Sequence, residues 1–352
     1  MQKPSKLAQI PQIRFAGFTN PWERRKFREL AVRESNCDIS SIDMPCVEYE
    51  DVIANEGQLN KDISLKEMQK KGIIFDGSQV LFGKLRPYLH NWLNPDFKGV
   101  AVGDWWVLRP IELDKNFLYR LIQTQQFDDI ANQSAGSKMP RADWNLIAET
   151  EFIVPSLIEE QIKIGSYFQS LDKLITLHQS KFEKLQKIKK SCLQNLFPQN
   201  NQNTPKIRFK NFSDEWVESK LKENCIYKSS NLSNSDIEKE GIYDLYDANG
   251  IIGKTKKNPQ TLDYITIIKD GSGVGRVRLL PKNTAFIGTM GALQSNNCIN
   301  FLYVLLQKMD FSFFINGATI PHIYFSDYGN AINKIPKNSK EQEKIGAFFS
   351  KL

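Results

Sequence analysis

The segment PSLIEEQIKIGSYFQSL at residues 155–171 recurs as PKNSKEQEKIGAFFSKL at residues 336–352. The two copies lie 181 residues apart and share the pattern P-x-x-x-x-E-Q-x-K-I-G, followed by matching phenylalanine and leucine positions. Self-similarity over such a distance is typical of a structural unit that has been duplicated. The fold of the whole chain therefore has to be read as two copies of one module.

Two further matches support the duplication. PQIRFAGFTNPWERRKFREL at residues 11–30 recurs as PKIRFKNFSDEWVESKLKEN at residues 205–224, with eight identical positions. Phe117–Tyr119 recurs as Phe301–Tyr303. The three matches come in the same order, and their spacing falls from 194 to 184 to 181 residues. The second copy therefore carries net deletions.

The interior of each module mixes strands and helices. Short apolar runs such as 80–82, 100–108, 264–268 and 285–287 are bounded by Gly, Asp and Asn, which predicts strands. Trp105 and Trp106 should point to opposite faces of one strand, so we expect one of them in the core. A helix is predicted near 116–130 and again near 298–309. The fold class is therefore α+β, built from two tandem α/β modules.

A long helix is predicted between the modules. Residues 160–196 contain no proline and a single glycine, and apolar side chains recur at alternating steps of four and three. At 1.5 Å per residue this coiled-coil-like rod is roughly 55 Å long. The second copy only begins the same helix at Glu341 before Leu352. We therefore expect either a truncated second helix or a partner that supplies it.

Composition limits the class of protein. The 352 residues are 41% hydrophobic and carry a formal net charge of +7, which fits two packed domains and permits a polyanionic partner. No run of eighteen apolar residues and no signal-peptide core is present, so we expect a cytoplasmic protein without a membrane partner. Five cysteines and three histidines show no metal-ligand spacing, and we expect no metal site.

Motifs for catalysis are also missing. The three Asn-Pro pairs do not continue as the motif of an adenine methyltransferase, and no Walker lysine is present. Gly271–Gly275 is glycine-rich but lacks the following helix and acidic residue of a dinucleotide site. No nuclease motif is evident. We therefore expect no catalytic residue and no cofactor in this chain.

Two modules that open with P-x-I-R-F-x-x-F-x-x-x-W and close with P-x-x-x-x-E-Q-x-K-I-G resemble the specificity subunit of type I restriction–modification systems. The resemblance covers residues 10–352 and departs from the family at the second long helix. It implies two target-recognition domains that each read half of a bipartite DNA sequence. The expected organisation is a first recognition domain (1–156), a central helical region (157–200), a second recognition domain (201–337) and a truncated distal region (338–352).

The resemblance also implies partners. A non-catalytic specificity subunit binds double-stranded DNA and docks methyltransferase subunits, expected to be two, with restriction subunits joining through the complex. S-adenosylmethionine would belong to the methyltransferase. The central helix and the two E-Q-x-K-I-G segments are the predicted docking surface, with self-association through the central helix as a further possibility. The residues concerned are Glu160, Gln161, Ile164, Phe168, Leu171, Ile175, Phe182, Leu185, Glu341, Gln342, Ile345 and Phe349.

Two segments in each module are candidates for DNA contact. Strand alternation over residues 77–90 would place Lys84, Arg86 and Tyr88 on one face, and cationic side chains suit guanine O6 and N7. The counterpart, residues 271–278, has backbone amides and arginines suited to phosphates. An exposed strand and a glycine hairpin are the alternatives. The candidates are Lys84, Arg86, Tyr88, His90, Arg276 and Arg278, with Ser137, Lys138, Arg141, Thr319 and His322 in the loop after each module's helix.

Two other functions compete with DNA recognition. A helical scaffold without DNA specificity would also use a long helix, and salt-dependent binding to duplex DNA separates the two. A fused methyltransferase is opposed by the absent catalytic motif.

Overall fold

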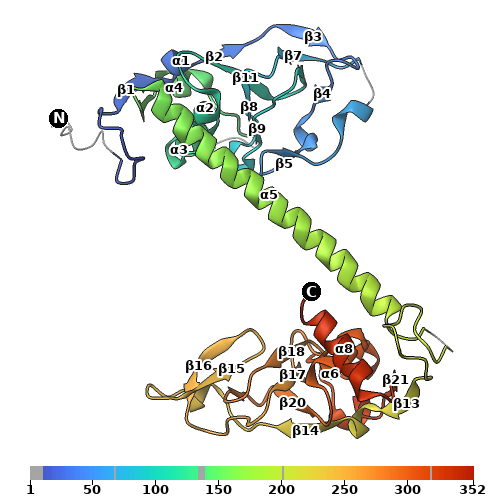
Figure 1. Cartoon of the computed structure of the whole chain (residues 1–352). Helices are drawn as coiled ribbons and strands as arrows, with labels where there is room; N and C mark the ends of the chain where they lie inside the picture. The colour runs from blue at the N-terminus through green and yellow to red at the C-terminus, as the bar shows by residue number, and fades with distance from the viewer. Residues whose placement is uncertain (1–10, 67–68, 134–138, 200–201, 318) are drawn as a thin grey trace. The chain divides into compact units, whose positions relative to one another are not determined.

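The computed structural model describes residues 11–66, 69–133, 139–199, 202–317 and 319–352. The chain divides into two compact units, Met1–His178 and Gln179–Leu352, each of which contains one copy of the repeat. The boundary falls within the helix α5 (Ile158–Asn195), which confirms the predicted long central helix (Figure 1). Among the described residues, no helix has the length and apolarity that crossing a membrane requires.

Module 1 contains two four-stranded sheets and two antiparallel pairs of strands, β1–β12 and β5–β6. One sheet has the order β2-β11-β8-β9 and the other β3-β7-β10-β4, while β1 pairs antiparallel with β12. The strands are β1 (Glu23–Lys26), β2 (Ala31–Glu34), β3 (Cys37–Ile39), β4 (Cys46–Val47), β5 (Val52–Ile53), β6 (Gln58–Leu59), β7 (Lys71–Phe75), β8 (Val80–Gly83), β9 (Trp92–Leu93), β10 (Gly99–Ala101), β11 (Trp105–Pro110) and β12 (Glu151–Val154).

Module 2 repeats this topology. The sheet β14-β20-β17-β18 corresponds to β2-β11-β8-β9, a three-stranded sheet β16-β15-β19 replaces the second one, and β13 pairs antiparallel with β21. The strands are β13 (Val217–Lys220), β14 (Cys225–Ser229), β15 (Tyr243–Tyr246), β16 (Ile251–Thr255), β17 (Tyr264–Ile268), β18 (Val277–Leu280), β19 (Ala285–Phe286), β20 (Met290–Ser295) and β21 (Ile332–Ile335). The α+β class and the duplication are therefore confirmed.

The helices match the predicted positions with one exception. The helix expected near 116–130 is two helices, because Thr124 caps a new start by accepting a hydrogen bond from the amide of Phe127. In module 2 the corresponding helix α6 is continuous and packs against α8 (Figure 1). The helices besides α5 are α1 (Phe27–Leu30), α2 (Lys115–Leu121), α3 (Gln125–Ala131), α4 (Trp144–Glu149), α6 (Ile299–Lys308), α7 (Phe325–Tyr328) and α8 (Ser339–Phe349).

The expectation that one of Trp105 and Trp106 lies in the core was wrong, because both are buried. Trp106 belongs to the cluster that covers one face of β11, with Phe82 and Phe127, whereas Trp105 belongs to a second cluster with Phe75. Both faces of β11 are therefore covered, as in a strand sandwiched between two apolar layers.

A buried ion pair joins the two ends of module 1. Glu160 in the first turns of α5 is 1% exposed, and its carboxylate accepts bonds from Arg14 Nε and Nη2, both at 2.6 Å. Trp22 Nε1 donates to the same carboxylate at 3.2 Å. Bidentate guanidinium–carboxylate pairs of this kind are strong and geometrically specific. The carboxylate also raises the pKa of Arg14.

Module 2 contains the same joint, by which we mean a buried glutamate that binds an arginine and a tryptophan from the start of the module. Glu341 accepts from Arg208 Nε at 2.7 Å and Nη2 at 2.8 Å, and from Trp216 Nε1 at 3.4 Å. The following glutamine is equally conserved between the copies: Gln161 donates to the Pro155 carbonyl and Gln342 to the Pro336 carbonyl. The repeated motifs I-R-F-x-x-F-x-x-x-W and P-x-x-x-x-E-Q are thus the two halves of one structural joint.

The glycine of each motif allows two helices to approach closely. A Cβ on Gly165 would lie 2.7 Å from Asn116 Cβ, and a Cβ on Gly346 would lie 2.8 Å from Asn300 Cβ. No side chain fits in this space. The E-Q-x-K-I-G pattern therefore specifies both the ion pair and the packing of α5 on α2 and of α8 on α6.

Replacing Glu160 by glutamine tests the joint in module 1. Glu160→Gln leaves the Arg14 guanidinium without its counter-charge, and removing one partner of such a pair is destabilising. We expect the free energy of unfolding of unit 1, measured in urea, to be lower than in the unsubstituted chain. Glu159→Gln, an exposed neighbour, is the matched control, and equal stability of the two variants would contradict the role of the pair.

Candidate nucleic-acid interface

Two loops of module 1 that carry predicted DNA contacts are joined through their backbones. The segment 84–90 follows β8, and the segment 139–142 precedes α4. The Arg86 amide donates to the Pro140 carbonyl at 2.7 Å, and the Ala142 amide donates to the Lys84 carbonyl at 2.9 Å. Segments more than fifty residues apart in the sequence therefore form one surface.

The predicted strand face of Lys84, Arg86 and Tyr88 was wrong. β8 ends at Gly83, Arg86 has a left-handed φ of 47°, and Pro87–Leu89 form a 3₁₀ turn. Proline lacks the amide that a ladder requires, so the strand cannot continue through Pro87. The three side chains instead project from an irregular loop.

Asp104, at the turn before β11, organises the cations of this surface. Its carboxylate accepts from Arg141 Nε at 3.2 Å and Nη2 at 3.1 Å, and Lys84 Nζ lies 3.6 Å away. The hydrogen bond from Arg141 lowers the pKa of Asp104, so the carboxylate stays ionised at neutral pH. Asp104 could not be identified from the sequence, because nothing in the local pattern links it to Arg141, 37 positions away.

The remaining candidates in module 1 differ in accessibility. Tyr88 is exposed on the 3₁₀ turn. His90 Nδ1 lies 2.6 Å from Asn55 Oδ1 and its Nε2 lies 2.9 Å from Asp128 Oδ1, while its ring stacks on Trp92. His90 thus ties the loop to its surroundings, and its contact with DNA stays a prediction. Ser137 and Lys138 lie outside the described residues.

Module 2 joins the corresponding loops in the same way. The turn Gly271–Gly275 connects β17 and β18, with positive φ at Gly271, Gly273 and Gly275. The Gly271 amide donates to the Pro321 carbonyl at 2.9 Å, and the Ile323 amide donates to the Lys269 carbonyl at 2.9 Å. Pro321 and Pro140 occupy equivalent places in the repeat, so the two modules present the same pair of loops.

The candidate arginines of module 2 converge on one carbonyl. Arg276 and Arg278 both donate to the Ala248 carbonyl, Arg278 Nη2 at 3.2 Å, which ties the β17–β18 turn to the β15–β16 loop. Thr319 is exposed, whereas His322 is half-buried with Nδ1 3.2 Å from the Ile320 carbonyl. The segment forms a glycine turn, the contact of its arginines with DNA stays a prediction, and each arginine retains further donors.

Exposed apolar side chains flank these loops and were missed from the sequence. Met139 and Ile320 each precede the equivalent proline of their module, and both are exposed. Phe313 and Tyr324 are exposed nearby in the sequence of module 2. The alignment of residues 136–140 with residues 317–321 contained this signal, since an apolar residue precedes proline in both copies. Apolar side chains beside cations suit the edges and methyl groups of bases.

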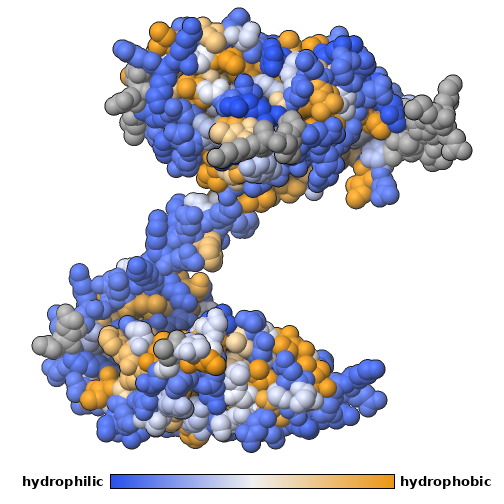
Figure 2. Space-filling model, turned by 180° about the vertical axis from the view of Figure 1, so that it is seen from behind, coloured by the Kyte–Doolittle hydropathy of each residue, from blue (hydrophilic) through white to orange (hydrophobic). Residues whose placement is uncertain are grey.

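The predicted docking residues fall into two groups. Six are buried inside their own modules: Glu160, Gln161, Glu341, Gln342, Ile345 and Phe349. On α5, Phe168, Ile175 and Phe182 are exposed, whereas Ile164, Leu171 and Leu185 are half-buried. In Figure 2, hydrophilic residues dominate the visible face of the exposed stretch of α5, with hydrophobic residues among them. The exposed apolar residues remain the ones available to a partner.

No group of three or more histidine, cysteine, aspartate or glutamate side chains in the described part of the chain is arranged to hold a metal ion.

The sequence matches the type I restriction modification DNA specificity domain over residues 20–189 and again over residues 213–352. This chain belongs to that family. The two matched segments coincide with the two copies of the repeat, so each module is one specificity domain. No protein of curated function gives a significant match.

One solved structure shares the fold, and a second matches with a lower score. The crystal structure of a type I restriction–modification S subunit from M. genitalium is 16% identical, with a TM-score of 0.67, and the match covers 96% of this chain and 90% of that one. The HsdS subunit from Thermoanaerobacter tengcongensis is 18% identical, with a TM-score of 0.38 and coverage of 96% and 90%.

Proposed function

We propose that this chain is the DNA-reading subunit of a type I restriction–modification complex and that each module reads one half of a bipartite target. The observation that carries the proposal is the pair of joined loops that both copies of the specificity domain present with cationic side chains. In module 1 these are Lys84, Arg86 and Arg141, and in module 2 they are Arg276 and Arg278.

The chemistry of these loops suits two tasks. Arginine donates a fork of N–H groups that matches guanine O6 and N7 or a phosphate. Glycine amides with left-handed φ in the Gly271–Gly275 turn can face a phosphate closely. Because the loop sequences differ between the modules, the two half-sites should differ as well.

The two units differ in charge. Residues 179–352 hold 25 lysine and arginine side chains against 16 aspartates and glutamates, whereas residues 1–178 hold 22 against 24. Sequence-independent attraction to DNA follows the number of cations placed near phosphates. Unit 2 should therefore supply most of the salt-dependent affinity.

Methyl transfer and cleavage would belong to partner subunits in this proposal. The chain positions them on DNA in the cytoplasm, and S-adenosylmethionine would bind the methyltransferase subunits, two for each chain. The docking surface is an apolar stripe on α5 that includes Ile175 at 55% exposure and Phe182 at 61%. Leaving a large apolar side chain in water forgoes about 1.5–3 kcal/mol, which favours a covered stripe.

An exchange of recognition segments tests the proposal as a whole. Replacing residues 30–150 by the corresponding segment of another family member should change one half-site and leave the other unchanged, because each module contacts DNA through its own loops. Methylation of a DNA library by the assembled complex provides the readout. A change in both half-sites would contradict the proposal of two independent readers.

Arg276 tests an individual contact. Arg276→Ala should weaken binding to the specific sequence by about 1–3 kcal/mol if the side chain reads a base. Lys282→Ala, an exposed cation of the same unit, is the control, and thermal unfolding checks that the Ala248 loop is intact. Arg86→Ala is the parallel test in module 1. An equal loss on all DNA sequences would instead assign the arginine to a phosphate.

Adding negative charge to the apolar stripe on α5 tests whether the stripe is a docking surface. Ile175 and Phe182 are two helical turns apart, so Ile175→Glu with Phe182→Glu places two carboxylates on one face. We expect loss of assembly with the methyltransferase subunit in gel filtration and unchanged thermal stability, because both side chains are exposed.

Gln169→Glu with Ser180→Glu adds the same charge to another face of α5 and is the matched control. Sedimentation of the isolated chain reports self-association through the stripe, which we expect to be antiparallel and isologous. Assembly that is equal in the two double variants, together with a monomer in the absence of partners, would contradict a role for the stripe.

A further inference from the structure

Module 2 presents a phenylalanine to solvent on a short, fixed turn. Phe313 is 84% exposed, the highest value for an aromatic side chain among the residues that the structure describes. It lies in a 3₁₀ helix between Phe311 and Phe314, which both pack in the core cluster of the module. The Asp310 carboxylate caps this helix by accepting from the Ser312 amide at 2.9 Å. A turn that is anchored on both sides of Phe313 therefore holds the phenyl ring in solvent.

The fold does not require an apolar side chain at this place. At the spacing of 184 residues that relates α6 to α2, Phe311 corresponds to Phe127, and both are buried. At the same spacing Phe313 corresponds to Asp129, which is exposed. The repeat thus keeps the side chain that packs, and it has a carboxylate in one copy and a phenyl ring in the other where the side chain faces solvent. Packing within the module does not explain the phenyl ring.

Contacts of the backbone join the 3₁₀ helix to the loops that we propose read DNA. The Asn316 amide donates to the His322 carbonyl at 2.9 Å, and the His322 amide donates to the Asn316 carbonyl at 2.8 Å. The glycine turn lies against the same helix, because a Cβ on Gly275 would lie 2.7 Å from Phe311 Cβ. Phe313 is therefore an exposed part of the surface that also includes the glycine turn and the loop of His322.

The chemistry of phenylalanine limits what it can recognise on a duplex. Its side chain has no hydrogen-bond donor or acceptor, so it cannot read the polar edges of guanine, cytosine or adenine. The C5 methyl group of thymine is the apolar feature that the major groove offers, and contact with it distinguishes bases. Insertion of a ring between base pairs is the other use of an exposed aromatic side chain, but stacking tolerates any sequence. A specificity domain therefore favours the contact with the methyl group.

We propose that Phe313 reads a thymine in the half-site of module 2 by contact of its phenyl ring with the C5 methyl group. This inference rests on the proposed function of the chain as a DNA reader and names a chemical feature of one half-site. Phe311 and Phe314 hold the turn in place before DNA binds, so little conformational freedom is lost on binding. The half-site of module 2 therefore contains at least one A·T pair, whereas module 1 has Asp129 at the corresponding place.

Replacing thymine by deoxyuridine tests the contact, because the two differ only by the methyl group. The target is selected from random duplexes with the assembled complex, and the exchange of residues 30–150 shows which half-site belongs to module 2. Each thymine of that half-site is then replaced singly, and fluorescence anisotropy gives the dissociation constant. We expect one position at which deoxyuridine lowers the affinity about fourfold, the effect of burying one methyl group.

Phe313→Ala shows whether this residue makes the contact. The variant should bind the thymine target at least about fourfold more weakly, and it should bind thymine and deoxyuridine at that position equally. Phe313→Asp, which introduces the side chain that module 1 has at this place, should also lose the preference for thymine. Ile332→Ala removes another exposed apolar side chain of module 2, in β21, and should keep the preference. Thermal unfolding should be unchanged in all three variants, because both side chains are exposed.

Three results would overturn this inference and leave the DNA-reading function intact. They are equal affinity for thymine and deoxyuridine throughout the half-site, a half-site without A·T pairs, and a preference for thymine that survives Phe313→Ala. In each case the complex would still select a bipartite target. A complex that selects no sequence would contradict the DNA-reading function and this inference together.

Discussion

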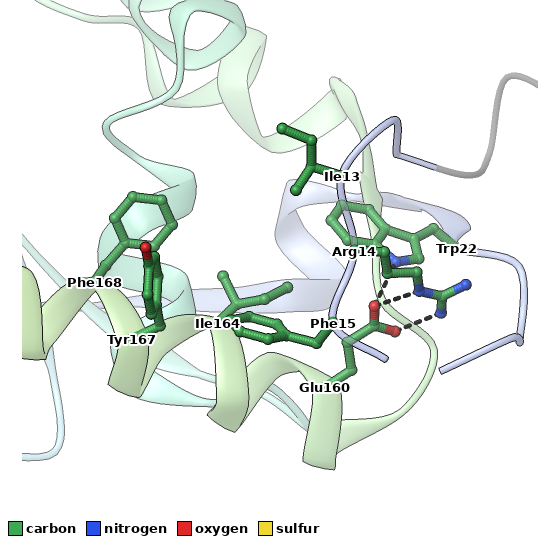
Figure 3. Close-up of a pocket in the computed structure, with 8 residues that line it drawn as sticks. All are labelled: Ile13, Arg14, Phe15, Trp22, Glu160, Ile164, Tyr167 and Phe168. Atoms are coloured by element: carbon green, nitrogen blue, oxygen red, sulfur yellow. Dashed lines mark hydrogen bonds and ion pairs between the residues drawn. The ribbon is translucent and has the colours of Figure 1, made fainter. Parts of the chain in front are cut away.

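A buried carboxylate needs a counter-charge, and this requirement closes both modules. Glu160 and Glu341 are almost fully removed from solvent, and each is neutralised by an arginine more than 130 residues earlier in the chain. Leaving either charge unpaired in the interior would cost several kcal/mol. In each module the ion pair therefore joins two segments at one point, as Figure 3 shows for Arg14 and Glu160. One segment precedes the domain and carries the arginine, and the other is the first turns of α5 or α8, which follow the domain. This joint accounts for the two sequence motifs that survived the duplication.

The joint leaves the rest of each module free to differ. The loops at Pro140 and Pro321 are held by backbone hydrogen bonds, which make no demand on side-chain identity. The side chains on these loops can therefore change without loss of the fold, as base recognition requires. Beside these loops, module 1 has the carboxylate of Asp104, whereas module 2 has a glycine turn with two arginines. A constant frame with variable loops suits a protein whose two halves read different sequences.

The sequence alone predicted the features that depend on local pattern or on repetition. The duplication, the α+β class and the long central helix follow from spacing and periodicity, and all three were confirmed. The features that depend on distant contacts were not predicted. Burial of Glu160 depends on Arg14, 146 positions away, so a surface role could not be distinguished from an internal one. The strand proposed through Arg86 failed at Pro87, and the layers on both faces of β11 could not be inferred from alternation.

We propose that one chain holds two separate DNA readers. Selection from a random pool of duplex DNA by the assembled complex, followed by sequencing of the bound molecules, tests this proposal. Two fixed half-sites separated by a spacer of constant length are the predicted result, because the spacing of recognition elements sets the spacing of half-sites. Enrichment of a single continuous sequence, or of no sequence at all, would contradict the account.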